Sequence, residues 1–292
     1  MVRAHMTDLY GDEAYTTGYN VYTTIEAKKQ QAAVDAVQSG ILAYDLRHGY
    51  RGSEGSIPVD KLTDVDVVAE LVAKMPTVGD IQPGVVTQVN EKNAIVSLSK
   101  EIIQLDIEGV KWARTYKSQN SLGPVIKKVT DVLKAGDIIR VVDTAKGWQL
   151  RQIPKASSAL VSLRPEDGSI AALMGGFDFY SSKFNRAIQA MRQPGSSFKP
   201  FIYSAAIEAG FTPASVINDA PVVFEDVALE DTWRPQNYSG KFFGPTRLRV
   251  ALFKSRNMVS IRLLNDMGRR HAMQHVTKFG FDRERLPYDL TL

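Results

Sequence analysis

The amino-acid sequence predicts an α+β fold with a small inserted β-barrel of the OB type. Three observations support this class. Residues 26–46 place their apolar side chains on one side, as a long helix requires. Short strand-like runs then follow one another between residues 78 and 154. A hairpin and a second helical region, which begins near Ser196, make up the remainder.

The first 77 residues are expected to form a linker, a strand and two helices. Residues 19–25 predict a strand by their β-branched and aromatic content. The helix over 26–46 follows directly, and residues 61–75 predict a second helix that ends at Pro76.

Residues 78–154 are predicted to be a separate OB-like domain. Strands are expected at 81–89, 93–98, 102–107, 137–142 and 148–153, separated by turn-forming residues. Short strands at this spacing favour a small closed barrel, a fold that can bind nucleic acids or sugars. Trp112 and Trp148 could stack on such a ligand, but an isolated tryptophan is more often a packing residue, and we expect packing here.

From residue 155 onward the sequence predicts a hairpin followed by helices. Strands at 159–163 and 169–176 flank a turn. The run 201–209 is apolar on most faces, which is typical of a buried helix, and Gly210 is a natural residue just past its end. A short helix over 248–253 and a longer one closed by glycine complete the chain.

Ser196 and Lys199 form the pattern S-x-x-K at the start of this buried helix. Residues three apart share one helical face, so the hydroxyl and the amine are expected within hydrogen-bond reach. A serine hydroxyl is a weak nucleophile until a base takes its proton. A lysine can be that base only when neutral, and burial promotes the neutral form. The pattern therefore indicates a nucleophile and its base.

Ser255 and Asn257 form a second pattern, S-x-N. Serine-lysine acyl-transfer enzymes carry S-x-x-K, then S-x-N, then K-[TS]-G in that order, and the third pattern is absent from these 292 residues. Second copies at 97–100 and 118–120 fall in the strand-rich middle, where a period of two separates the residues of S-x-x-K; we interpret both as chance matches. Ser255 could instead cap a helix, and Asn257 could be a satisfied polar residue.

Composition narrows the function class. The 36 basic and 32 acidic residues give a net charge of +4 without basic clusters, so nucleic acid is not an expected partner. There is no cysteine, and the four histidines lack metal-site spacing, so no metal or other cofactor is expected. No apolar run approaches the ~20 residues that span a bilayer. We therefore expect these residues to be soluble, with any membrane anchor outside them.

By its motifs, the chain resembles the class A penicillin-binding proteins, most closely the 1A type of Gram-negative bacteria. The resemblance is carried, in order, by V-Y-T-T-I, A-Y-D-L-R-H-G-Y-R-G, V-S-L-R-P-E-D-G-S-I-A-A-L-M-G-G, F-N-R-A, R-Q-P-G-S-S-F-K-P-F, W-R-P-Q-N-Y and S-R-N. It implies a partial serine-lysine, penicillin-binding transpeptidase fold that begins near residue 155. It also implies a bifunctional peptidoglycan synthase of the inner membrane, facing the periplasm. The chain would start beyond the glycosyltransferase and lack the C-terminal part of the transpeptidase, so the fragment alone is expected to be inactive.

The resemblance also implies a role for each candidate residue. Ser196 would attack the D-Ala-D-Ala end of a stem peptide, Lys199 would take its proton, Ser255 would relay a proton to the leaving amine, and Asn257 would hydrogen-bond Lys199 or the substrate. Two aromatic residues of the W-R-P-Q-N-Y loop, Trp233 and Tyr238, would line the substrate cleft.

Expected partners are peptidoglycan stem peptides, β-lactam antibiotics and an outer-membrane lipoprotein activator that binds the OB-like domain. The main alternative is an inactive fragment that serves as a scaffold or binding module. A β-lactamase or penicillin sensor with the same motifs is disfavoured, because nothing supplies a deacylation base and the inserted β domain has no place there.

Overall fold

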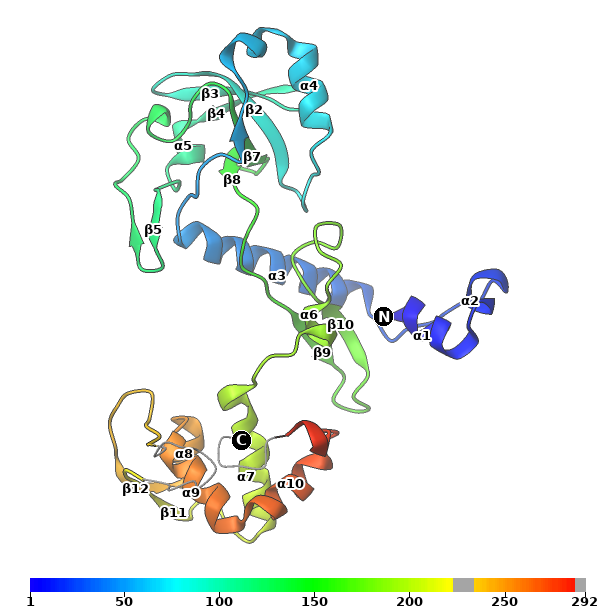
Figure 1. The fold of residues 1–292 in the computed structure, drawn as a ribbon, viewed down its shortest axis with the longest axis vertical. Coiled ribbons are helices and arrows are strands. Elements are labelled where there is room, and N and C mark those ends of the chain that lie inside the picture. The colour runs from blue at the N-terminus through cyan, green and yellow to red at the C-terminus, as the bar shows by residue number, and fades with distance from the viewer. Residues whose placement is uncertain (223–233, 287–292) are drawn as a thin grey trace. The chain divides into compact units, whose positions relative to one another are not determined.

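The computed structural model describes residues 1–222 and 234–286, and the chain divides into two compact units, 1–190 and 191–292. Figure 1 shows the mixture of helices and antiparallel strands that the sequence predicts. Within the described residues, no helix is both long and apolar enough to cross a membrane.

The first unit begins with two short exposed helices, α1 (Val2–Tyr10) and α2 (Glu13–Thr16). The predicted long helix is present as α3 (Ala27–Arg47). Its buried side chains recur every fourth residue, so they form one stripe: Ala33, Val37, Ile41 and Asp45.

The helix α3 packs against a hairpin of β9 (Leu160–Leu163) and β10 (Ile170–Met174), as expected for residues 159–176. The Gln30 side chain joins the two elements, since it donates to the Leu173 carbonyl (3.0 Å) and accepts from the Leu173 amide (2.9 Å). The short helix α6 (Arg186–Gln189) follows, with Asn185 as its cap.

The strand predicted over residues 19–25 is wrong. In the described part of the chain, this segment and the residue after it make two hydrogen bonds to β10. The Thr24 hydroxyl donates to the Ile170 carbonyl (2.8 Å), and the Glu26 amide donates to the Ala171 carbonyl (2.9 Å). A ladder needs repeated backbone bonds on both strands. Of the aromatic residues here, Tyr22 is exposed and Tyr19 stacks on the Tyr10 ring of α1 instead of on a neighbouring strand.

The OB-like region contains a six-stranded antiparallel sheet within the described residues, in the order β1-β7-β2-β3-β4, with β8 also paired to β7. The strands are β1 (Gly55–Ser56), β2 (Gln82–Val89), β3 (Asn93–Ser97), β4 (Ile102–Asp106), β7 (Asp137–Val142) and β8 (Gln149–Arg151). The expected strands are thus all present, with ends that differ by one or two residues.

Shorter elements surround this sheet. The helix α5 (Ile107–Val110) lies against both β4 and β8. A small two-stranded sheet, β5 (Tyr116–Ser118) with β6 (Ser121–Leu122), and the turn η2 (Val129–Asp131) complete the region. Trp112 and Trp148 pack against the apolar core, and the Trp112 indole N–H donates to the Leu150 carbonyl (2.9 Å), so packing explains both.

The single helix predicted over 61–75 is instead two elements, the 3₁₀ turn η1 (Val59–Thr63) and the helix α4 (Val65–Ala73). Asp64 separates them because its carboxylate accepts the backbone N–H groups of Asp66 and Val67, both at 3.1 Å. Aspartate is a preferred N-cap residue, so a new helix begins after Asp64 although the apolar pattern continues through it.

The second unit is built around α7 (Lys199–Glu208), which the 3₁₀ turn η3 (Gly195–Phe198) precedes. The helices α8 (Leu248–Phe253), α9 (Asn257–Met267) and α10 (Arg269–Thr277) pack around it, with a hairpin of β11 (Val216–Asp219) and β12 (Gly244–Arg247) and the turn η4 (Arg283–Arg285). The predicted buried helix is confirmed, and Gly210 after its end has φ +95°.

An ion-pair cluster joins α7 to α10. Glu208 contacts both His275 Nδ1 and Lys278 Nζ, and His275 Nε2 shares a hydrogen bond with the Ser204 hydroxyl (2.9 Å). The Lys278 and His275 hydrogen bonds lower the pKa of Glu208 to about 2.

This cluster gives an expected pH dependence of stability. The pKa of Glu208 is lower in the folded state than its ordinary value of 4.5, so its contribution is full above 4.5 and is lost as the pH falls toward 2. We expect Glu208→Gln to lower the melting temperature modestly at pH 7, and this difference to vanish between about pH 4.5 and 2. The control Glu284→Gln, in the same unit, should show neither effect. A Glu208→Gln difference that persists unchanged at pH 2 would contradict the assignment.

Candidate active site

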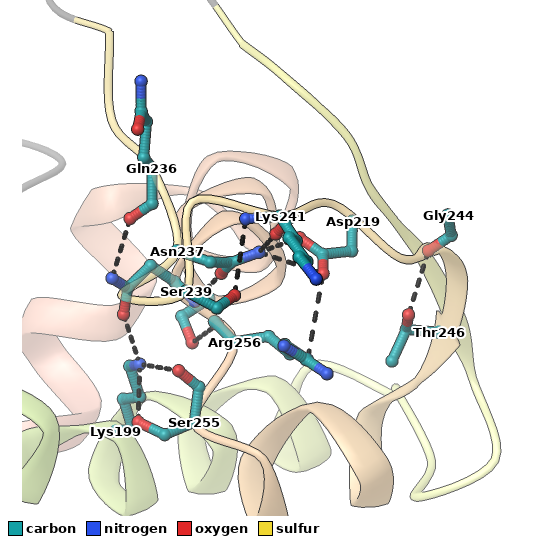
Figure 2. A network of polar contacts seen from close by, with 12 residues as sticks. Lys199, Asp219, Gln236, Asn237, Ser239, Lys241, Gly244, Thr246, Ser255 and Arg256 are labelled. Carbon is teal, nitrogen blue, oxygen red and sulfur yellow. Dashed lines mark hydrogen bonds and ion pairs between the residues drawn. The ribbon is translucent and has the colours of Figure 1, made fainter.

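The structure brings together the four residues of S-x-x-K and S-x-N. Ser196 lies in η3 and Lys199 begins α7, while Ser255 follows α8 and Asn257 begins α9. Residues nearly sixty positions apart in the chain therefore meet at one place, as Figure 2 shows for the Lys199 and Ser255 side chains.

Lys199 donates three hydrogen bonds from its Nζ atom. They reach the Ser255 carbonyl (2.9 Å), the Ser255 hydroxyl (3.0 Å) and the Asn257 side-chain oxygen (2.6 Å). Half-burial lowers the pKa of Lys199 below its usual value of 10.5, because desolvation penalises the charged ammonium. This is the direction that a lysine base requires.

Ser255, and not Lys199, contacts the Ser196 hydroxyl. Ser255 Oγ lies 3.0 Å from Ser196 Oγ, and no hydrogen bond joins Ser196 to Lys199 directly within residues 1–222 and 234–286. The expected direct contact was wrong because the Lys199 amine is turned toward Ser255 and Asn257, whose three oxygens take its hydrogen bonds.

The backbone of Ser255 supports this role. Its φ of +52° makes it the one non-glycine residue in the left-handed region among the described residues. Such a conformation costs on the order of 1 kcal/mol and is found preferentially at functional sites. The carbonyl and the hydroxyl of Ser255 both contact Lys199, and the residue at the N-cap of α9 is Arg256, so Ser255 does not cap this helix.

The hydrogen-bond donors and acceptors around Lys199 define one path for a proton. A neutral lysine amine has two N–H groups and one lone pair. The Ser255 carbonyl and the Asn257 side-chain oxygen are acceptors only, so they take the two N–H groups. The lone pair then faces the Ser255 hydroxyl. That hydroxyl donates to Ser196 Oγ while it accepts from Lys199, and with neutral Lys199 it can instead donate to the lysine and accept from Ser196. The geometry allows a proton to move from Ser196 through Ser255 to Lys199.

The two aromatic candidates differ from the motif residues. Tyr238 is fully exposed, and Trp233 lies outside the described residues. The sequence analysis missed their neighbours Gln236 and Asn237, which contact Asn257 directly. It also missed Asp219, although an acidic residue on the buried face of a strand, two positions after Ile217, is a signal that a polar partner is near.

Comparison with known proteins matches both regions of the chain. Residues 50–156 match the family described as "Penicillin-binding protein OB-like domain", and residues 158–291 match "Penicillin binding protein transpeptidase domain". The whole chain is 48% identical to penicillin-binding protein 1A of Pseudomonas aeruginosa and 42% identical to that of Escherichia coli, and it spans about 35% of the length of each.

Among solved structures, penicillin-binding protein 1A from Haemophilus influenzae matches with a TM-score of 0.87 and 36% identity, over 99% of this chain and 42% of that one. The match includes the OB-like and the transpeptidase regions together, in the order that the sequence predicts. The chain belongs to the class A penicillin-binding proteins of the 1A type.

Proposed function

We propose that this chain carries the acylating centre of a peptidoglycan D,D-transpeptidase, which cross-links stem peptides and is the target of β-lactams. The observation that supports it most directly is the hydrogen-bonded series from Ser196 through Ser255 to Lys199, with Asn257 holding the lysine. This arrangement activates a serine without a histidine.

In the acylation step, Ser196 Oγ attacks the carbonyl carbon of the penultimate D-alanine. Its proton passes to Ser255 while the Ser255 proton passes to neutral Lys199. Backbone N–H groups stabilise the tetrahedral oxyanion, and the Ser196 N–H is one expected donor. When the intermediate collapses, the bond to the terminal D-alanine breaks, and the proton returns from Lys199 through Ser255 to the leaving nitrogen.

The deacylation step repeats the same path. An amine of a second stem peptide attacks the Ser196 ester, forms the cross-linking amide and gives its proton back through Ser255, which restores the serine hydroxyl. Water in place of the amine would give carboxypeptidase activity. A β-lactam would form the same ester as its ring amide opens.

Membership of this family supports a location, a second activity and a partner for the whole protein. A protein of this type would sit in the inner membrane with these residues in the periplasm and would also polymerise glycan strands through a glycosyltransferase domain. An outer-membrane lipoprotein that binds the OB-like domain would be its activator. Because no K-[TS]-G occurs in the 292 residues, these residues alone are expected to acylate slowly or not at all.

The experiment that tests the function is covalent labelling of the full-length gene product with a fluorescent penicillin, followed by mass spectrometry of its peptides. We expect one adduct, on the peptide that contains Ser196, and none on the peptide that contains Ser97. Absence of any adduct, or an adduct elsewhere, would overturn the proposed acyl-transfer function.

A further inference from the structure

A buried carboxylate lies behind the candidate active site. Asp219, the last residue of β11, is 0% exposed, and it faces the side chain of Asn237, which is 5% exposed. Asn237 Nδ2 donates to both carboxylate oxygens (2.8 and 3.0 Å) and to the Lys241 carbonyl (2.9 Å), as Figure 2 shows. Burial of a carboxylate is unfavourable unless it is paired, so this pair needs an explanation.

The positive partner of Asp219 comes from the S-x-N segment itself. Arg256 Nε lies 3.9 Å from Asp219 Oδ2, and its guanidinium stacks over the Phe243 ring, 3.3 Å from the ring centroid. Arg256 is the residue between Ser255 and Asn257. Asp219 is therefore tied to the motif by a side chain as well as through Asn237.

Asp219 fixes which way the Asn237 amide points. An ionised carboxylate can only accept hydrogen bonds, so the NH₂ group of Asn237 must face it. The oxygen of Asn237 then faces the other way, where it accepts the backbone N–H of Asn257 at 2.8 Å. That N–H belongs to the first residue of α9 and has no partner within the helix.

Gln236 fixes the Asn257 side chain in the same manner. Its backbone carbonyl accepts a hydrogen bond from Asn257 Nδ2 at 2.9 Å, so the NH₂ group of Asn257 must point to it. The side-chain oxygen is left facing Lys199 Nζ at 2.6 Å. Two consecutive residues, Gln236 and Asn237, thus hold both the backbone and the side chain of Asn257.

The orientation of the Asn257 amide decides where the Lys199 lone pair points. With the oxygen toward Lys199, the lone pair of the neutral amine faces Ser255, as derived above. With the amide turned over, its NH₂ group would donate to Lys199 and would draw the lone pair away from the proton path.

We propose that Asp219 and Asn237 are positioning residues for acylation, which hold Asn257 so that its oxygen faces Lys199 and the proton path through Ser255 stays open. This inference rests on the proposed acyl-transfer function. It assigns catalytic importance to two residues that touch neither the nucleophile nor its base.

The test measures the second-order rate of acylation by a fluorescent penicillin in the full-length gene product. Removal of one partner of a buried hydrogen bond costs enough to slow the reaction roughly ten- to a hundredfold if it is lost in the transition state. We expect Asn237→Ala to show a loss in this range. Asp219→Asn has the same shape but leaves the Asn237 NH₂ group one side-chain acceptor oxygen in place of two, beside the Lys241 carbonyl, so Asn237 is held less firmly and we expect about a tenfold loss.

Two control variants change the same loop and hairpin without touching this path. Ser239→Ala removes a hydroxyl that accepts the Lys241 amide N–H (3.4 Å), and Thr246→Val removes a half-buried hydrogen bond to the Gly244 carbonyl (2.9 Å). Both should acylate within about threefold of wild type once the folded fraction is measured by thermal unfolding. If Asn237→Ala does not fold, the acylation rate of Asp219→Asn alone tests the proposal.

A double-mutant cycle separates positioning from simple destabilisation. If Asn237 acts through the Asn257 side chain, Asn237→Ala should cost little further acylation rate in an Asn257→Ala background. An equal loss in both backgrounds would overturn the proposal. An acylation rate of Asn237→Ala or Asp219→Asn within threefold of wild type would also overturn the proposal.

The pH profile gives a second readout. The Asn257 oxygen stabilises the ammonium form, so its displacement should lower the pKa of Lys199 further. The rise of acylation with pH should then begin at lower pH in Asn237→Ala than in wild type, although the rate is smaller. The charged groups of the network, Asp219, Lys241 and Arg256, are all kept in this variant. An unmoved profile would contradict positioning, whereas an adduct that survives Ser196→Ala would instead overturn the underlying function.

Discussion

Replacement of Ser196 by alanine is expected to abolish penicillin acylation of the full-length gene product. Alanine has no nucleophile, so no ester can form, whatever the state of the neighbouring lysine. The measurement is covalent labelling by a fluorescent penicillin, with a folding check by thermal unfolding. Because Ser196 is exposed in η3, its removal should leave the fold intact.

Two serines provide matched controls for this result. Ser197 is the next residue and is also exposed, and Ser97 belongs to the second copy of S-x-x-K. Ser97 is 3% exposed at the end of β3, where a β-lactam cannot reach it. Both Ser197→Ala and Ser97→Ala should keep full labelling. Labelling that survives Ser196→Ala would show that another residue is the nucleophile.

The sequence predicted the parts of this site that local patterns determine. S-x-x-K and S-x-N are short motifs with fixed spacing, and the helical context of Ser196 and Ser255 separated them from their copies in the strands. The buried helix and the OB-like strands were predictable for the same reason, since periodicity reflects burial directly.

The rest depended on contacts that no local pattern contains. The role of Ser255 as a bridge follows from its positive φ and from its contacts with two distant residues, and neither has a sequence signature as strong as an apolar stripe. The contacts of Asn237 with Asp219 and Asn257 join segments 18 and 20 residues apart. In the loop that contains Asn237, sequence alone favours the aromatic residues Trp233 and Tyr238, because aromatic side chains are the commoner binding residues.

Lys199→Arg is the second change with a large expected effect. Arginine keeps the positive charge and nearly the length, but it cannot give up its proton in a protein, so it cannot be the base. Loss of a general base costs roughly 10²–10⁴ in rate, and we expect a loss of this size in penicillin acylation. Lys254→Arg is the matched control, since Lys254 lies over the Phe253 ring and makes no hydrogen bond in the Ser196–Ser255–Lys199–Asn257 network.

The pH dependence distinguishes a lost base from a misplaced side chain. Only neutral Lys199 can accept the proton, so wild-type acylation should rise as the pH increases. Burial lowers the pKa of Lys199, which places that rise below the ordinary lysine value of 10.5. In Lys199→Arg the rise should disappear, because no group in the path then titrates, whereas Lys254→Arg should keep it. Near-normal acylation by Lys199→Arg, or a wild-type rate that does not change with pH up to 10.5, would mean that another group takes the Ser196 proton.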